Sequence, residues 1–122
     1  MGQPVRGDVV VLPFPYSNLA ASKRRPALVI AKADPHGDVI LCMITSQNTR
    51  DACAVPLVQS DFANGSLPLD SNARPNRLFT ADTSIIIRKA GHLTPEKLDA
   101  VVAAIIDIIA SGQESEPTST DR

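Results

Sequence analysis

Two clusters of polar side chains in this chain could together bind an anion. One cluster is cationic and precedes an apolar run at residues 27–31; the other carries hydroxyl and amide groups and follows an apolar run at residues 40–44. The members of the two clusters are Lys23, Arg24, Arg25, Thr45, Ser46 and Gln47. Cationic groups beside hydroxyl and amide donors form an anion site, and the commonest such anion is phosphate.

The two apolar runs predict a pair of strands that would bring these clusters together. Both runs are short, rich in β-branched residues and bounded by Gly, Pro or Asp, which is typical of buried strands. The link between them contains Asp34, Pro35 and Gly37, residues that favour a reversal of the chain. If the strands pair antiparallel, the start of the first lies beside the end of the second, so both clusters share one sheet edge.

The overall composition limits what kind of site this can be. A length of 122 residues favours one domain with a modest core. The net charge of −1 means that an anion-binding surface must be a local patch, and an aromatic content of 3% disfavours rows of stacking aromatics. The sequence contains no metal-ligand spacing, no phosphate-binding glycine loop and no serine nucleophile elbow. We therefore expect no metal or other cofactor.

Further short strands are indicated on both sides of this pair. Residues 9–12 form a strong strand signal that begins after Gly7 and Asp8 and is expected to end at Pro13. Residues 54–58 contain Pro56, which indicates an edge strand. A turn is expected at residues 64–66, a loop with at most one short strand at 67–77, and strands at 78–80 and 85–88, with 89–91 turning out of the last.

One helix is expected near the end of the chain. Thr94 is a good N-cap, Pro95 a good first helical residue, and Gly112 a good terminator. The apolar residues repeat at helical spacing over an arc wider than one small sheet needs. Either the helix is well buried or part of it meets a partner subunit. Residues 113–122 are polar and are expected to be a disordered tail.

The cysteines, histidines and first residues suggest an intracellular protein without a special site. Cys42 lies within an apolar run and is expected to be a buried free thiol rather than half of a disulfide with Cys53. His36 is expected in an exposed turn, and His92 at the surface or near the helix cap. The sequence contains no signal-peptide core and no apolar run of about 20 residues, so we expect a cytoplasmic protein with no membrane contact.

Many short strands followed by a single helix predict a small, strongly bent antiparallel sheet or barrel with an appended helix. Arg, Lys, Thr, Ser and Gln at one edge of such a sheet can hold a phosphodiester and stabilise charge while a neighbouring hydroxyl attacks it. RNA carries that hydroxyl itself, at the 2′ position. RNA cleavage without a metal is therefore a permitted hypothesis.

Four segments together resemble the MazF/PemK toxins of type II toxin–antitoxin systems. Residues 6–11 are similar to the family's R-G-D-[VI] strand, residues 23–30 to its R-P-x-[LV]-V segment, and residues 44–47 to its [IV]-T-[ST] motif. Residues 91–109 resemble the family's closing turn and helix. The match spans residues 5–109, and the order and spacing of the motifs are more specific than each motif alone.

The resemblance implies a mainly β fold, in which an SH3-like barrel of short antiparallel strands carries a C-terminal α-helix, as in MazF- and CcdB-like toxins. It implies a toxin domain over residues 1–111, followed by a tail at 112–122, and usually a homodimer. It further implies a metal-independent endoribonuclease that cuts single-stranded RNA, often sequence-specifically, and that is inhibited by a cognate antitoxin protein.

The resemblance also implies roles for single residues. Arg25 would handle the scissile phosphate and proton transfer, and Thr45 would bind the phosphate and stabilise the transition state. Lys23, Arg24, Ser46 and Gln47 are further candidates for RNA binding without a role defined by the motifs. The chain departs from many members in the loop at residues 13–22 and in residues 79–83. Asp82, in the second segment, would oppose phosphate binding unless an arginine pairs with it.

Two alternatives to a ribonuclease remain open at this point. One is a non-catalytic toxin or adaptor on the same barrel that binds a protein, as a gyrase-poisoning relative of the fold does. The other is a degenerate small barrel whose only partner is another protein. Neither requires Arg25 and Thr45 to lie together at one sheet edge.

Overall fold

The computed structural model describes residues 3–14, 23–46 and 52–112 of the chain. These residues form seven strands, two short 3₁₀ helices and one α-helix. In chain order the elements are β1 (Asp8–Phe14), β2 (Lys23–Lys32), β3 (Asp38–Thr45), β4 (Val55–Leu57), η1 (Gln59–Asp61), β5 (Phe62–Gly65), β6 (Ser71–Asp82), η2 (Thr83–Ile85), β7 (Arg88–Leu93) and α1 (Pro95–Ser111).

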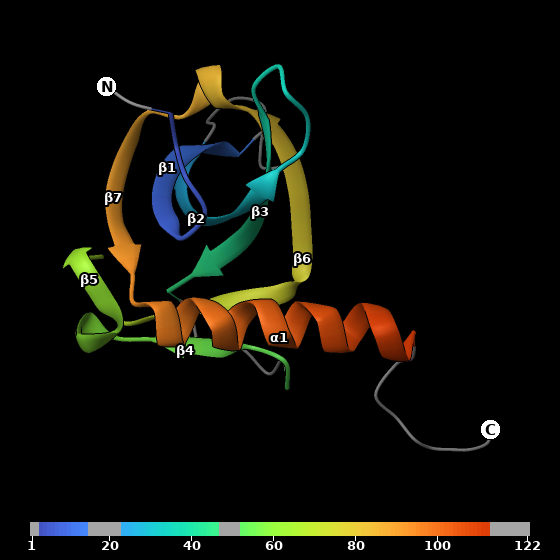
Figure 1. Ribbon diagram of the computed structural model, residues 1–122. Helices are drawn as coiled ribbons and strands as arrows, with labels where there is room; N and C mark the ends of the chain where they lie inside the picture. The colour runs from blue at the N-terminus through green and yellow to red at the C-terminus, as the bar shows by residue number, and fades with distance from the viewer. Residues whose placement is uncertain (1–2, 15–22, 47–51, 113–122) are drawn as a thin grey trace.

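The seven strands form one antiparallel sheet in the order β4-β6-β3-β2-β1-β7-β5. The sheet curls strongly, so that β6 and β7 lie on either side of β1, β2 and β3, and α1 runs across one end (Figure 1). This arrangement confirms the mainly β prediction of a bent, barrel-like sheet with a C-terminal helix. It also confirms that residues 54–58 contain an edge strand, because β4 is outermost in the sheet.

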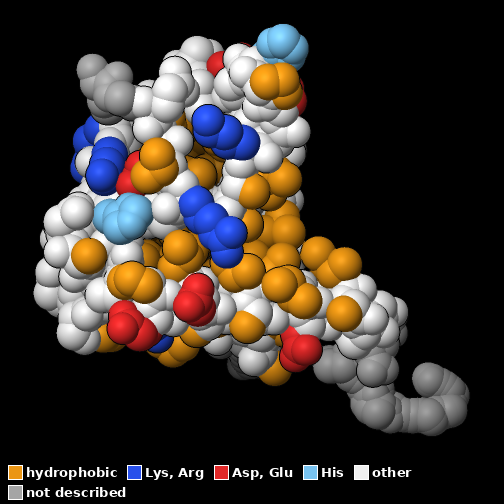
Figure 2. All heavy atoms as spheres, viewed as in Figure 1, with side chains coloured by type: hydrophobic (Ala, Val, Ile, Leu, Met, Phe, Trp, Pro, Cys, Tyr) orange, Lys and Arg blue, Asp and Glu red, His pale blue; other side chains and the backbone are white. Residues whose placement is uncertain are grey.

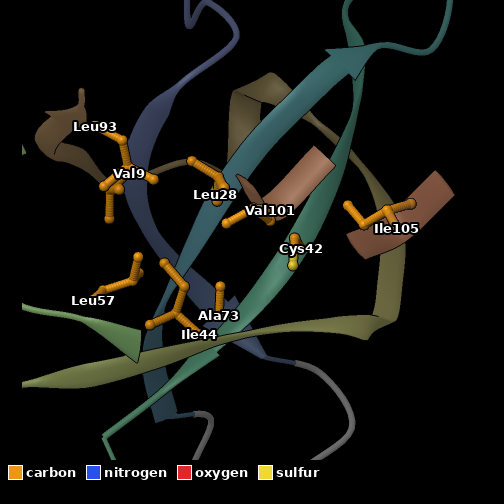
Figure 3. Packing of buried hydrophobic residues seen from close by; sticks show 9 residues of the cluster. All are labelled: Val9, Leu28, Cys42, Ile44, Leu57, Ala73, Leu93, Val101 and Ile105. Atoms are coloured by element: carbon orange, nitrogen blue, oxygen red, sulfur yellow. The ribbon is translucent and has the colours of Figure 1, made fainter. Parts of the chain in front are cut away.

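Both faces of the central strands are buried, in two separate hydrophobic cores. The helix-side core contains Val101 and Ile105 of α1 packed on side chains from β1, β2, β3, β4, β6 and β7 (Figure 3). The barrel-side core lies on the opposite face of the same strands, and its buried members are Val10, Leu12, Phe14, Ala27, Val29, Val39 and Leu41. Continuous apolar runs suit strands that are buried on both sides, which is why β2 and β3 lack a simple alternation of polar and apolar residues.

The predicted pairing of β2 with β3 is confirmed. Ala27 lies opposite Met43, and Leu28 lies opposite Cys42. The reversal between the strands is held by the carboxylate of Asp34, whose Oδ1 accepts hydrogen bonds from the backbone N–H groups of residues 36–38 at 2.9–3.2 Å. Gly37 has φ +128°, a conformation that glycine adopts without strain. His36 is exposed in this turn, as expected.

Helix α1 begins and ends as predicted. The Thr94 Oγ1 accepts a hydrogen bond from the Lys97 N–H at 3.3 Å, and Gly112 closes the helix in the left-handed conformation at φ +60°. The Lys97 ammonium donates to the Pro56 carbonyl at 3.1 Å, which attaches the first turn to β4. Within the described part of the chain, no helix combines the length and apolar character that crossing a membrane requires.

Three boundaries differ from the predictions. Strand β1 does not end at Pro13 but continues to Phe14. Proline has no N–H group to donate to a neighbouring strand, and it is tolerated here because the pairing of β7 with β1 ends at Val11 and leaves one side of Pro13 without a partner strand. The expected turn at residues 64–66 falls partly in β5. The last strand is not residues 85–88 but β7, which runs through residues 89–91.

The largest difference is β6, a twelve-residue strand that confirms the strand expected at residues 78–80 but also takes in residues 71–77, where a loop with at most one short strand was expected. Its Pro75 falls in an irregularity, since Met43 pairs with Arg74 while Cys42 pairs with Leu78. Residues at such a bulge need not donate to the ladder, so proline is tolerated there. The expected tail at residues 113–122 lies outside the described residues.

The carboxylate of Asp8 joins β1 to β7. Asp8 is only 3% exposed; its Oδ2 accepts from the Val5 N–H at 2.9 Å, and its Oδ1 lies 2.8 Å from His92 Nδ1 and 3.3 Å from Lys89 Nζ. His92 is therefore a partner of a buried acid rather than a surface or capping residue. Gly7, at φ +99°, packs beneath this imidazole: a Cβ there would lie 2.9 Å from its Cε1.

Burial raises the pKa of Asp8, but the hydrogen bonds from Val5, His92 and Lys89 outweigh this effect, and the net pKa lies below the ordinary value of 3.8. Because the pKa of Asp8 is lower in the folded state than in the unfolded state, the ionised Asp8 carboxylate stabilises the fold at pH values above its unfolded-state pKa. That contribution is lost as the pH falls through the folded-state value.

We predict that Asp8→Asn lowers the free energy of unfolding at pH 7 by about 2 kcal/mol, because Lys89 and His92 lose a charged, buried acceptor. The wild type should also lose stability more steeply than Asp8→Asn below about pH 4. Urea unfolding between pH 7 and pH 3 measures both effects. Asp99→Asn, on the exposed face of α1, is the control and should change stability little. Parallel pH curves for wild type and Asp8→Asn would contradict the prediction.

Cys42 is a buried free thiol, as predicted. It is 0% exposed, and its Sγ donates to the Arg74 carbonyl at 3.2 Å. Burial raises the pKa of Cys42 to about 12, and the contact with Arg74 only partly offsets this effect. Cys53, also free, is half-buried.

An alkylating reagent at pH 8 should therefore modify Cys53 and spare Cys42 in the folded protein. At that pH only about one Cys42 thiol in 10⁴ would be the reactive thiolate, and its burial blocks access as well. Mass spectrometry with and without denaturant measures which of the two cysteines is alkylated. Modification of Cys42 at the rate of Cys53 under native conditions would show that this part of the core opens readily.

Candidate functional site

A cavity of about 380 Å³ opens where β2 begins and β3 ends. Its volume lies at the lower end of the range of roughly 300–1,000 Å³ that is typical of ligand sites. The cavity is lined by β1, β2, β3, the start of β7 and the segment that leads into β6. Its lining residues are Val11, Arg24, Arg25, Pro26, Ile44, Thr45, Ser46, Leu67, Pro68, Leu69, Ser71, Ile87 and Arg88.

The register of β2 and β3 brings Arg25 and Thr45 together. The ladder between the two strands begins at Ala27 and Met43; Arg25 lies two residues before Ala27 in β2, and Thr45 lies two residues after Met43 in β3, so strand alternation places both on the face of that pair. Paired residues of an antiparallel ladder share a face of the sheet. Arg25 and Thr45 are both half-buried, and both line the cavity. The predicted proximity of the two polar clusters is therefore present in the fold.

The other predicted residues are divided. Arg24 and Ser46 line the cavity too; Arg24 precedes Arg25 in β2 and so belongs to the opposite face of that strand, whereas Ser46 follows the end of β3. Side chains from both faces of the strands line the cavity because the cavity lies at the end of the strand pair. Lys23 is exposed at the start of β2, opposite Phe14, and is not a lining residue. Gln47 and residues 15–22 lie outside the described residues.

The structure adds cavity residues that the sequence did not suggest. Arg88, the first residue of β7, lies opposite Val11 of β1, and Val11 in turn lies opposite Pro26. Ile87 and Leu69 contribute exposed apolar side chains. No motif marks these residues, because they enter the site through the pairing of β7 with β1, which local sequence does not encode.

The Ser71 hydroxyl shapes the wall of the cavity. Ser71 is 6% exposed, and its Oγ donates to the Leu69 carbonyl at 2.9 Å. This bond holds the backbone of the segment that leads into β6. Thr45 and Ser46 are two further lining residues with hydroxyl groups.

The electrostatics of the cavity favour an anion. Three arginines, Arg24, Arg25 and Arg88, line it, and none of its described lining residues is acidic. Among residues 3–14, 23–46 and 52–112, none of these three arginines takes part in an ion pair. The described lining is thus locally cationic, although the whole chain has a net charge of −1.

Asp82 does not oppose this charge. It lies opposite Asp38 at the start of β3, whereas Thr45 is at the end of that strand, about 23 Å away along the strand. Its carboxylate caps η2 by accepting from the Ser84 N–H at 2.8 Å. The hydrogen bonds with Ser84 lower the pKa of Asp82, so it stays ionised at neutral pH.

The lining supplies cationic and hydroxyl donors next to apolar side chains. It contains no imidazole, carboxylate or thiol, the usual protein ligands for a metal ion. Such a set can bind a phosphate group and stabilise negative charge that develops on its oxygens.

Several solved structures share this fold. A MazE–MazF complex from Deinococcus radiodurans aligns with a TM-score of 0.71 at 21% identity, covering 89% of this chain and 98% of that one. An endoribonuclease from a mycobacterial species, in complex with its cognate antitoxin, aligns at 0.69 and 18%, covering 90% and 96%. The Mycobacterium tuberculosis toxin MazF-mt6 aligns at 0.65 and 22%, covering 84% and 96%. At these identities the likeness establishes the fold.

Sequence comparison establishes the family. No curated protein sequence matches the chain significantly. The sequence model of the PemK-like, MazF-like toxins, however, matches residues 5–109, which is most of the chain and the same span as the resemblance in the motifs. The chain therefore belongs to the PemK-like, MazF-like toxin family of type II toxin–antitoxin systems.

Proposed function

We propose that this toxin is an endoribonuclease that cuts single-stranded RNA without a metal ion. The observation that carries the proposal is the cavity that Arg25 and Thr45 both line, where β2 begins and β3 ends, with three arginines and no acidic residue among its described lining residues. Family membership supports the same activity, as does the fold that the chain shares with a mycobacterial endoribonuclease.

In the proposed reaction the 2′-oxygen of one nucleotide attacks the adjacent phosphorus. The bond from phosphorus to the 5′-oxygen breaks, and the proton lost by the 2′-hydroxyl ends, in net terms, on the departing 5′-oxygen. The products are a 2′,3′-cyclic phosphate and a 5′-hydroxyl. Negative charge accumulates on the phosphoryl oxygens in the transition state, and fixed donors aimed at them lower the barrier.

Arg25 and Thr45 are the donors that we assign to this charge. A guanidinium stays protonated at neutral pH, so Arg25 can form charge-assisted hydrogen bonds to the phosphoryl oxygens and to the leaving oxygen. The Thr45 hydroxyl would donate to a second phosphoryl oxygen. Their common face on adjacent strands supports this pairing, whereas Arg24, Ser46, Lys23 and Gln47 are assigned to RNA binding.

The proposal includes two protein partners. A cognate antitoxin would inhibit the toxin, as the fold neighbours solved with antitoxins suggest. A second copy of the chain would cover part of α1, where Ile106 and Ile109 are 59% and 68% exposed, within a band of hydrophobic side chains along the helix (Figure 2). We infer a cytoplasmic location, in which messenger RNA and the antitoxin are both accessible.

The wild-type chain should cut a long RNA of mixed sequence in the presence of EDTA and leave 5′-hydroxyl ends. Arg25→Ala should lower kcat by about 10³-fold, because the transition state loses its main cationic donor. Cleavage products resolved by gel and by end-labelling measure both effects. Lys32→Ala, which removes a charge at the far end of the same strand, is the control and should cut at the wild-type rate.

Two results would contradict this prediction. A folded wild type that cuts no RNA would favour the alternative of a toxin that binds a protein, to be pursued by capture of protein partners. Cutting that survives Arg25→Ala in nuclease-free preparations would keep the activity but move its site.

Thr45→Val should lower kcat by about 10²-fold, and Thr45→Ser should restore most of the loss, because only the hydroxyl group is needed. Val has nearly the shape of Thr, so the fold is expected to survive. The test compares the single-turnover cleavage rates of the wild type, Thr45→Val and Thr45→Ser on a short RNA that contains one mapped cut site. Equal rates for Thr45→Val and the wild type would remove Thr45 from the catalytic pair.

A further inference from the structure

The cavity has a second cationic position that the Arg25–Thr45 pair does not use. Arg88 lies on β7, and β1 separates it from β2, so its backbone is about 10 Å from that of Arg25. Arg88 pairs with Val11 and Val11 with Pro26, so these three residues share one face of the sheet. Arg25 belongs to the other face. The two guanidinium groups therefore approach the cavity from different directions.

The surroundings of Arg88 are apolar. Ile87 directly precedes Arg88 in the chain and is 39% exposed, and Leu69, which lines the same cavity, is 64% exposed. Both side chains are on ordered backbone: the Ile87 N–H donates to the Val11 carbonyl at 2.8 Å, and the Leu69 carbonyl accepts from Ser71 Oγ at 2.9 Å. Exposed aliphatic side chains held in place beside a guanidinium that forms no ion pair with the described residues are suited to a ligand that has both an apolar face and a negative charge.

We propose that Arg88, Ile87 and Leu69 form a binding position for the nucleotide next to the cleavage point. Arg88 binds the neighbouring phosphate, one nucleotide from the scissile one, and the base of that nucleotide rests against Ile87 and Leu69. The proposal rests on the proposed ribonuclease function and extends it from the reacting phosphate to sequence preference. It also assigns base recognition to aliphatic side chains, in a chain in which only 3% of the residues are aromatic and could stack on a base.

A phosphate contact away from the reacting atoms holds the ground state and the transition state equally. Its loss therefore raises KM and leaves kcat nearly unchanged, unlike the loss of Arg25. It also lowers the number of phosphates that the protein neutralises, and each such contact contributes about 0.7 to the slope of log K against log salt for single strands. These two signatures separate a binding residue from a catalytic one.

The test uses a short RNA that spans a mapped cut site and carries a 2′-O-methyl group at the attacking oxygen, so that it binds without being cut. Fluorescence anisotropy from 50 to 300 mM salt compares the wild type with Arg88→Ala. We expect Arg88→Ala to bind about tenfold more weakly, with a salt slope smaller by about 0.7. Lys32→Ala is the matched charge control, because Lys32 lies seven residues further along β2 than Arg25.

Neutral phosphate analogues then locate the contact. A methylphosphonate replaces the phosphate on the 5′ side or on the 3′ side of the cut site in turn. At one of the two positions the wild type should lose affinity while Arg88→Ala loses none. Mapping of cut sites for Ile87→Ala and Leu69→Ala on a mixed RNA should show a relaxed base preference at a single position, with kcat at the best site within about twofold of the wild type.

Several outcomes would overturn the proposal. An unchanged affinity and salt slope for folded Arg88→Ala would remove Arg88 from RNA binding, as would equal methylphosphonate effects in both proteins at both positions. A fall in kcat as large as that of Arg25→Ala would make Arg88 part of the reaction centre instead. In each of these cases wild-type cleavage persists, so the proposed function stands; a wild type that neither cuts nor binds RNA removes both.

Discussion

The pairing of β2 with β3 is the constraint on which the rest of the molecule depends, because both faces of these strands are buried. Leu28 and Cys42 pack in the helix-side core, while Val29 and Leu41 pack in the barrel-side core. A slip of one residue would exchange the two sets of side chains and break both cores at once. The register is therefore strongly specified from Ala27–Met43 to Val29–Leu41, before the irregularity between Val29 and Ala31. The proposed catalytic pair lies on the same two strands, two residues beyond Ala27 and Met43 toward the open end of the hairpin, so it is carried by packed strands.

Local charge explains how a chain of net charge −1 can bind a polyanion. Arg24, Arg25 and Arg88 line one cavity, whereas two of the acidic residues serve the fold: Asp82 caps η2 at the far end of β3, and Asp8 is buried against β7. Binding energy drawn from phosphate contacts is sensitive to salt and indifferent to sequence. Sequence preference must therefore come from neutral contacts with the bases. In a lining without aromatic side chains, these contacts fall to aliphatic residues and hydroxyl groups.

The parts of the fold that local chemistry decides could be predicted from the sequence. The helix from its Thr94 cap to Gly112 is one such part, and the turn held by Asp34 is another. Only residues 78–80 of β6 could be predicted as a strand, because residues 71–77 are polar and contain Pro75; those residues form a strand because β3 and β4 pair with them. Arg88 was missed for the same reason. Residues brought to the cavity by one hairpin were visible in the sequence, whereas those brought by the closure of the sheet between β1 and β7 were not.

The closure between β1 and β7 gives the buried Asp8 a second importance. Its carboxylate holds Lys89 and His92, and Lys89 directly follows Arg88. The position of Arg88 opposite Val11 therefore depends on the attachment of β7 to β1. The β2–β3 hairpin is held directly by the pairing of its two strands, and it shares the helix-side core with Leu93 of β7. The two halves of the cavity are thus attached in different ways: the half on β2 and β3 carries the proposed chemistry, and the half on β7, which Asp8 joins to β1, carries the proposed contact with the next nucleotide. A change at Asp8 would disturb the second half first, so RNA binding would weaken before the catalytic pair moved.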